Sequence, residues 1–149
     1  MSRIFSISAL AAISLAGAAS AQDAAPHFAL QTTTDGVIAL SARAFAEGDY
    51  HRAAELAGQR AARPISPSRR SAAYANLCAA QSMLGNHDAA IEACEAANGH
   101  RVSWEAQTNY GAALFNAGRP ADAAAAFAYA GQIAPNEGVV QANLALTAQ

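Results

Sequence analysis

The chain is short of charge, and it contains no lysine at all. Only 13% of its 149 residues are charged; nine arginines face eleven acidic residues, so the formal net charge is −2. A protein that binds nucleic acid needs a basic face to meet the phosphate backbone. This charge balance therefore argues against a nucleic-acid partner.

Sequence motifs of enzymes and metal sites are also missing. The sequence has no G-x-S-x-G, no phosphate-binding glycine loop and no H-E-x-x-H. The four histidines do not cluster, and no pair has the spacing of a zinc protease; they are His27, His51, His87 and His100. We therefore expect no catalytic residues, no metal and no cofactor.

Runs of β-branched residues are scarce, whereas alanine is abundant throughout. Alanine is the strongest helix former and β-branched residues favour strands. The composition predicts an all-helical protein before any motif is considered.

The first stretch of the chain resembles a secretory signal peptide. Arg3 gives a positively charged start, residues 4–16 are apolar or small, and Ala19-Ser20-Ala21 matches an A-x-A cleavage pattern. We predict cleavage after Ala21; loss of Arg3 would leave eight arginines and eleven acidic residues, a charge of −3. The apolar run is short for a transmembrane helix, so a retained anchor is the less favoured alternative. We expect a bacterial periplasmic or secreted protein with no stable membrane insertion after cleavage.

Three glycines, Gly48, Gly85 and Gly118, set the register of an internal repeat. Seven residues before each glycine is a small residue, and five residues after it is alanine. The small residues are Ser41, Cys78 and Gly111, and the alanines are Ala53, Ala90 and Ala123. Small residues at facing positions allow two helices to approach closely, and glycine tolerates the left-handed backbone that often ends a helix. The pattern predicts helical hairpins that turn at the glycines.

The pattern predicts helices at 33–46, 50–62, 70–84, 87–98, 102–117, 120–132 and 137–147. Asp49 and Asn86 are suited to cap the helices that follow them, and Pro120 suits the first turn of another. Pro64 and Pro67 predict an interruption over residues 63–68. Residues 22–31 are expected to be a flexible N-terminus.

Residues 104–135 resemble a tetratricopeptide repeat. The matching residues are Trp104, Tyr110, Gly111, Leu114, Gly118, Ala123, Phe127, Ala130 and Pro135. Residues 71–102 and 34–65 are weaker copies, and residues 136–148 would form a C-terminal capping helix. The resemblance implies a right-handed solenoid of about three helix hairpins over residues 32–149.

Cys78 and Cys94 are the only cysteines, and they lie eight residues before and eight after Asn86 in the expected turn. Residues equidistant from the turn of an antiparallel helix pair lie at the same level. An exported protein meets an oxidising compartment, so we predict a disulfide between them. The alternative is a pair of free thiols buried side by side.

The resemblance also suggests a binding surface. In tetratricopeptide folds, the first helix of each hairpin lines a concave groove, and Asn76, Asn109 and Asn143 fall on that side. A carboxamide can both donate to and accept from the backbone of an extended peptide. The neighbouring residues supply no cation, which argues against a clamp for a peptide carboxylate. The alternative is that these asparagines are solvated or bind a neighbouring helix.

We interpret the chain as an exported interaction module without enzymatic activity, whose partner is a protein or peptide bound on the concave face. Two alternatives remain open. One is a structural accessory subunit of an envelope complex, and the other is a thiol-redox protein that uses Cys78 and Cys94.

Overall fold

The computed structural model describes residues 24–148, and every regular element in that range is an α-helix. The elements are α1 (Gly36–Ala46), α2 (Tyr50–Ala61), α3 (Pro67–Met83), α4 (His87–His100), α5 (Trp104–Asn116), α6 (Pro120–Ile133) and α7 (Gly138–Thr147). The predicted all-α class is confirmed. None of these helices is long and apolar enough to cross a membrane. The predicted signal peptide, residues 1–21, lies outside the described residues.

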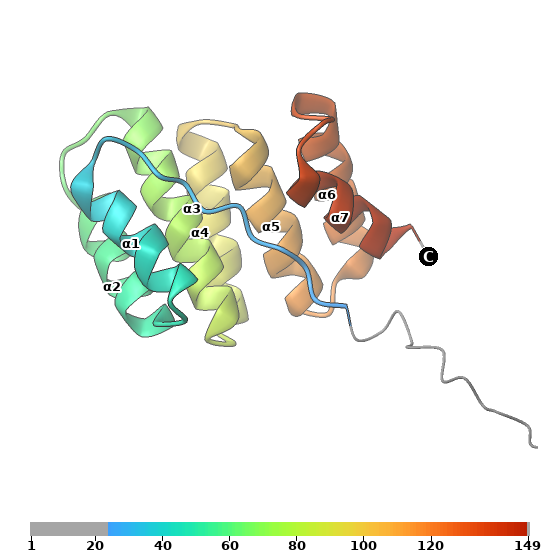
Figure 1. Cartoon of the computed structure of the whole chain (residues 1–149), viewed down its shortest axis with the longest axis horizontal. Coiled ribbons are helices and arrows are strands. Elements are labelled where there is room, and N and C mark those ends of the chain that lie inside the picture. Colours follow the sequence, from blue (N-terminus) through green and yellow to red (C-terminus); the bar gives the residue numbers. More distant parts are fainter. Residues whose placement is uncertain (1–23, 149) are drawn as a thin grey trace, which may run out of the picture.

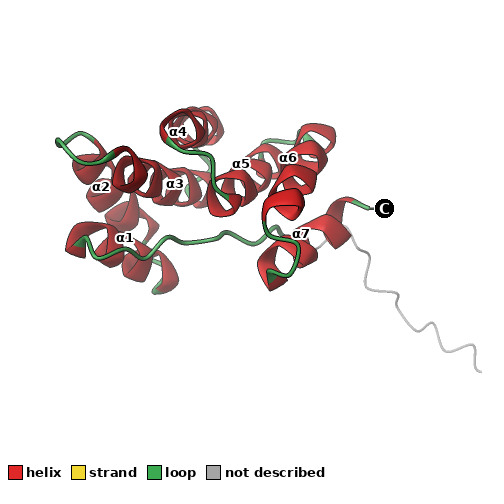
Figure 2. Ribbon diagram, turned by 90° about the horizontal axis from the view of Figure 1, so that it is seen from above, coloured by secondary structure: helices red, strands yellow, loops and turns green. Residues whose placement is uncertain are grey.

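The helices pack in the order of the sequence, each against the next (Figure 1). In addition, α1 contacts α3, α3 contacts α5, and α5 contacts α7. The odd-numbered helices therefore form a continuous layer, which we call the inner layer, and α2, α4 and α6 lie against it. Seen from above, an extended segment crosses the open side of this layer between α1 and α7 (Figure 2).

The three glycines of the repeat end α1, α3 and α5 as predicted. Their φ angles are 82° at Gly48, 77° at Gly85 and 75° at Gly118. At each turn, the N–H of the glycine and the N–H of the residue after it donate hydrogen bonds to carbonyls in the last turn of the helix. At the end of α3, the Gly85 N–H donates to the Ser82 carbonyl (3.1 Å) and the Asn86 N–H donates to the Gln81 carbonyl (3.0 Å). This pair of bonds is a Schellman motif, which satisfies the last carbonyls of a helix.

The boundary of α3 differs from the prediction. The helix begins at Pro67, so Pro67 opens the helix instead of interrupting it, and the break is confined to residues 62–66. Ser66 Oγ accepts from the Arg69 N–H at 3.4 Å, and a proline in the first turn costs no hydrogen bond because that N–H would be unpaired. Asn86 precedes α4 but does not cap it through its side chain, and its Nδ2 donates to Gln81 Oε1.

The interior is built mainly from alanine. Few large apolar side chains are fully buried; they are Phe127, Ile38, Leu114 and Val140. In the third hairpin, a Cβ added at Gly111 would lie 2.5 Å from the ring atoms Cδ1 and Cε1 of Phe127. Gly111 and Phe127 are thus a complementary pair, in which the absence of a side chain on α5 makes room for a ring on α6.

The equivalent pair in the middle hairpin is Cys78 and Cys94, also sixteen residues apart. They form the predicted disulfide, with an S–S distance of 2.05 Å and Cα atoms 5.2 Å apart. Both residues are fully buried between α3 and α4. The same place between paired helices is therefore filled by a glycine and a ring in one hairpin and by a covalent bridge in another.

Candidate functional site

A segment with no helix, residues 24–34, crosses the inner layer from α7 to α1 (Figures 1 and 2). We call it the strap. Residues 22–31 are expected from sequence to be flexible, but from Ala24 onward they lie on the surface that the resemblance assigns to a peptide. Hydrogen bonds from three buried asparagines hold the strap there.

The central contact joins Ala29 of the strap to Asn109 of α5. The Ala29 N–H donates to Asn109 Oδ1 at 2.7 Å, and Asn109 Nδ2 donates to the Ala29 carbonyl at 3.0 Å. Both polar groups of one backbone residue are therefore satisfied by one side-chain amide. Asn109 is fully buried and Ala29 is 5% exposed, so this contact is shielded from water.

The same two-bond contact is repeated on either side. Asn76 on α3 accepts from the Gln31 N–H (2.8 Å) and donates to the Gln31 carbonyl (3.0 Å). Asn143 on α7 accepts from the His27 N–H and donates to the His27 carbonyl, both at 2.8 Å. We call the three side chains the asparagine ladder; it comes from three successive helices of the inner layer.

The register of the ladder follows from the geometry of an extended chain. In an extended chain, residues two apart present their N–H and C=O groups on the same edge, and the ladder contacts His27, Ala29 and Gln31. Two extended residues advance by about 6.6 Å, which is less than the roughly 8–10 Å between the axes of packed helices. The tips of the asparagines must therefore converge toward the strap.

Two of the asparagines also join neighbouring helices. Asn109 Nδ2 donates to the Ala75 carbonyl of α3 at 3.1 Å, and Asn76 Nδ2 donates to Ser41 Oγ of α1 at 3.0 Å. The described contacts of the Asn143 side chain all go to the strap. Asn76 and Asn109 therefore bond both to the strap and to a neighbouring helix, and only Asn143 serves the strap alone.

Apolar side chains of the strap complete the contact. The ring of Phe28 meets that of Phe45 edge to face, with centroids 5.9 Å apart, and it also packs against the apolar cluster between α5 and α6. Pro26 is buried, whereas His27 and Thr32 are exposed. The strap thus buries Pro26 and Ala29 and packs the partly buried ring of Phe28 between them in the sequence Pro26-His27-Phe28-Ala29.

Asp35 fixes the end of the strap where it enters α1. Its Oδ1 accepts from the Val37 and Ile38 N–H groups (3.2 and 3.4 Å), which caps the helix. Its Oδ2 binds Nε and Nη2 of Arg60 on α2 at 2.7 and 2.6 Å. The hydrogen bond from Arg60 lowers the pKa of the Asp35 carboxyl below its usual value, although burial opposes this. One carboxylate therefore anchors the strap, α1 and α2 together.

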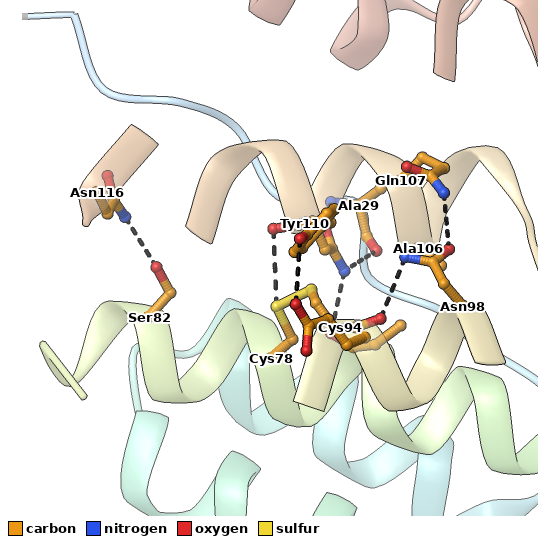
Figure 3. Close-up of a disulfide and its surroundings, with 12 residues drawn as sticks. Ala29, Cys78, Ser82, Cys94, Asn98, Ala106, Gln107, Tyr110 and Asn116 are labelled. Atoms are coloured by element: carbon orange, nitrogen blue, oxygen red, sulfur yellow. Dashed lines mark hydrogen bonds between the residues drawn. A yellow bond between two sulfur atoms is a disulfide. The ribbon is translucent and has the colours of Figure 1, made fainter. Parts of the chain in front are cut away.

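The disulfide between Cys78 and Cys94 (Figure 3) lies next to one member of the ladder, Asn109. Cys78 Sγ is 3.7 Å from the carbonyl oxygen of Asn109; a disulfide sulfur carries no proton, so this is a packing contact. The bridge therefore ties the helix pair α3–α4 together next to the α5 residue that holds Ala29.

The histidines and acidic residues within residues 24–148 do not form a metal site. In the described range, no group of three or more His, Cys, Asp or Glu side chains is placed to hold a metal ion. Near the break between α2 and α3, Arg69 Nη2 donates to Thr34 Oγ1 at 3.4 Å and Arg70 Nη2 donates to the Arg63 carbonyl at 3.2 Å.

No protein-family model matches this chain, and the searches of curated proteins and of solved structures found no match either. The likeness to tetratricopeptide repeats is thus an interpretation of the sequence pattern.

Proposed function

We propose that this chain is an exported protein-interaction module, a short tetratricopeptide-like solenoid that holds an extended protein segment on its concave inner layer. The spacing of Gly48, Gly85 and Gly118, which ends three first helices in the same way, supports the repeat interpretation. The disulfide favours an oxidising compartment, and together with the leader-like start it supports a periplasmic or secreted location.

The observation that carries the proposal is the asparagine ladder. Each amide binds the N–H and the C=O of one residue, so the ladder recognises backbone and imposes an extended conformation without reading side chains directly. Backbone pairing of this kind supplies affinity in several modes of peptide recognition, while flanking pockets supply specificity. A surface already shaped to hold one extended segment is suited to hold another.

The strap occupies this site in the structure, so a foreign segment must displace it. Ala29→Pro removes the N–H that donates to Asn109 and should release the strap within an otherwise full-length chain. The probe is a synthetic peptide of residues 24–34, titrated by fluorescence anisotropy. We expect at least tenfold tighter binding of the peptide to the Ala29→Pro chain than to the wild-type chain.

Thr32→Pro is the matched control, because Thr32 is exposed and its N–H has no hydrogen-bond partner among the described residues. This variant should bind the peptide as weakly as the wild type does. If neither chain binds the peptide, or if both proline variants bind it equally, the peptide-recognition proposal fails.

The filled site also favours a second candidate, the structural accessory subunit. In that case the strap is a permanent brace across α1, α3, α5 and α7, and partners use other faces of the molecule. This candidate predicts that the strap of the wild-type chain never opens, so the peptide fails to bind at any concentration that leaves the protein folded.

The thiol-redox alternative is not proposed further. Thiol–disulfide exchange requires a thiolate to reach one of the sulfur atoms, whereas Cys78 and Cys94 are both 0% exposed between packed helices. The bridge is better explained as a brace between α3 and α4.

A further inference from the structure

We propose that the partner of this site is an uncharged, extended segment in which an aromatic residue directly precedes a small one, as Phe28 precedes Ala29 in the strap. This inference rests on the proposed function, because it takes the strap as the chain's own copy of the ligand. Three properties of the site, namely its backbone pairing, its space and its lack of charge, point to this chemistry.

Backbone pairing restricts where proline can stand in the ligand. The residues equivalent to His27, Ala29 and Gln31 must each supply an N–H, so proline is excluded at all three positions. The intervening residues have no such requirement, and the strap places Pro26 one residue before the first paired position. A ligand therefore tolerates proline only at alternate positions.

The ligand residue that takes the place of Ala29 and pairs with Asn109 must have a small side chain, because little space is available there. Ala29 is 5% exposed, and its backbone is bonded on both polar groups to an asparagine that is itself fully buried. A larger side chain at this position has to push the backbone away from Asn109 or displace the surrounding wall. Either change breaks the central pair of hydrogen bonds, so alanine, glycine or serine fits and leucine does not.

The preceding position is shaped for an aromatic ring. Phe28 meets Phe45 edge to face, and Phe45 in turn meets Tyr50 edge to face with centroids 5.1 Å apart. These rings lie on α1 and α2, while the other contacts of Phe28 lie on α5 and α6. Phe28 thus bridges the first and third hairpins, and no other strap side chain has this reach in the described contacts.

Charge is absent from the centre of the contact surface, since the hydrogen bond from Arg69 to Thr34 Oγ1 (3.4 Å) lies at the last residue of the strap. None of the four ion pairs in the described range involves a strap residue; the nearest, between Asp35 and Arg60, lies just beyond the strap. A charged side chain facing the buried part of the ladder would lose its water without gaining a partner, which is costly. The site therefore selects against acidic and basic residues at its centre.

The strap also sets a threshold for this ligand. A tethered segment competes at an effective concentration on the order of millimolar, so a free ligand of equal intrinsic affinity binds the wild-type chain only weakly. A ligand succeeds when it fits the aromatic and small positions better than Phe28 and Ala29 do, or when the strap is removed.

The test uses the full-length Ala29→Pro chain and four synthetic peptides of residues 24–34. One peptide has the strap sequence, one carries Ala29→Leu, one carries Phe28→Ala, and a matched control carries Thr32→Val at an exposed position. We expect the Ala29→Leu and Phe28→Ala peptides to bind at least tenfold more weakly than the strap sequence, with the control within twofold of it. His27→Pro is a second release variant, to be used if the Ala29→Pro chain does not fold.

The outcomes separate the two proposals. If the strap sequence binds but all four peptides bind alike, the ligand class is refuted while peptide recognition stands. If the strap sequence itself does not bind, the proposed function is refuted as well. A wild-type chain that forms dimers which the strap peptide dissolves would assign the site to a second copy, and it would overturn the assignment to a foreign partner.

Discussion

Asn143 and His27 lie 116 residues apart in the sequence and exchange two hydrogen bonds of 2.8 Å each. The contact joins the start of the described chain to its last helix, α7. Because Asn109 and Asn76 repeat it on α5 and α3, the strap bonds to three of the four helices in the inner layer. The stability of the domain and the availability of its inner layer are therefore linked through one short segment.

Replacing each asparagine of the ladder by alanine should lower the free energy of unfolding by a different amount. Asn143→Ala removes bonds to the exposed His27 only, so water can replace them, and we expect a loss of about 1 kcal/mol in the free energy of unfolding. Asn109→Ala strands the buried N–H and C=O of Ala29 and also removes the bond to the Ala75 carbonyl of α3, and we expect roughly 2–3 kcal/mol. Urea unfolding followed by circular dichroism measures both values.

Asn136→Ala is the matched control for the asparagine variants, because Asn136 is exposed in the turn before α7. Its free energy of unfolding should stay within about 0.5 kcal/mol of the wild type, as for most surface changes. An equal loss for Asn109→Ala and Asn143→Ala would contradict the added contribution of the buried Ala29 contact and of the bond from Asn109 to α3.

The disulfide should contribute substantially to stability. Cys78 and Cys94 close a loop with a sequence separation of 16, and a loop of this size stabilises by roughly 3 kcal/mol in the chain-entropy model. We expect the double variant Cys78→Ala, Cys94→Ala to lose about that much in urea unfolding, and the reduced wild type to behave similarly. No difference between oxidised and reduced wild type would contradict the bridge.

Gly111→Ala should destabilise the third hairpin, because the new Cβ meets the Phe127 ring at 2.5 Å. Overpacking of this kind costs about 1–3 kcal/mol, and a smaller side chain in Phe127→Leu should recover part of it in a double-mutant cycle. Gly99→Ala is the control, since nothing lies within 4 Å of its added Cβ in α4. A Gly111→Ala chain as stable as the control would refute the close packing of Gly111 on Phe127.

Because of Asp35, the free energy of unfolding should decrease at low pH. Its pKa is lowered in the folded state by the bond from Arg60, relative to an ordinary value of 3.8. Because the pKa is lower in the folded state, the Asp35 carboxylate contributes fully to the free energy of unfolding at pH values above its pKa in the unfolded chain. This contribution shrinks as the pH falls through 3.8 and is lost below the pKa of the folded state. Asp35→Asn should remove this part of the acid dependence, as measured by thermal unfolding between pH 7 and pH 3. An unchanged slope in that variant would show that the ion pair is not responsible.

The repeat could be predicted from sequence because its signals are local and periodic. Glycines at 48, 85 and 118 needed a left-handed backbone, and Cys78 and Cys94 were equidistant from a turn. The start of α3 was harder to predict, since Pro67 breaks a helix in its interior but is welcome in its first turn; only Ser66 before it distinguishes the two cases.

The strap could not be predicted in this way. Residues 24–34 have no helical period and no counterpart in the repeat, so nothing local predicts where they lie. The sequence pattern places the three asparagines on one side of the helices, but it does not show that residues 27–31 of the same chain lie against them. The one available signal was that three asparagines recur at intervals of 33 and 34 residues without charge nearby, as buried amides that need backbone partners would do.

Hydrogen exchange of individual strap amides in the wild-type chain, measured by NMR, tests the central claim most directly. The ladder predicts slow exchange at His27, Ala29 and Gln31, with Ala29 slowest, and faster exchange at Phe28 and Leu30, whose N–H groups have no bonded partner among the described residues. Asn143→Ala should abolish protection first at His27. Uniformly fast exchange across residues 27–31 would contradict the account, because it would mean that the asparagines do not hold the strap in solution.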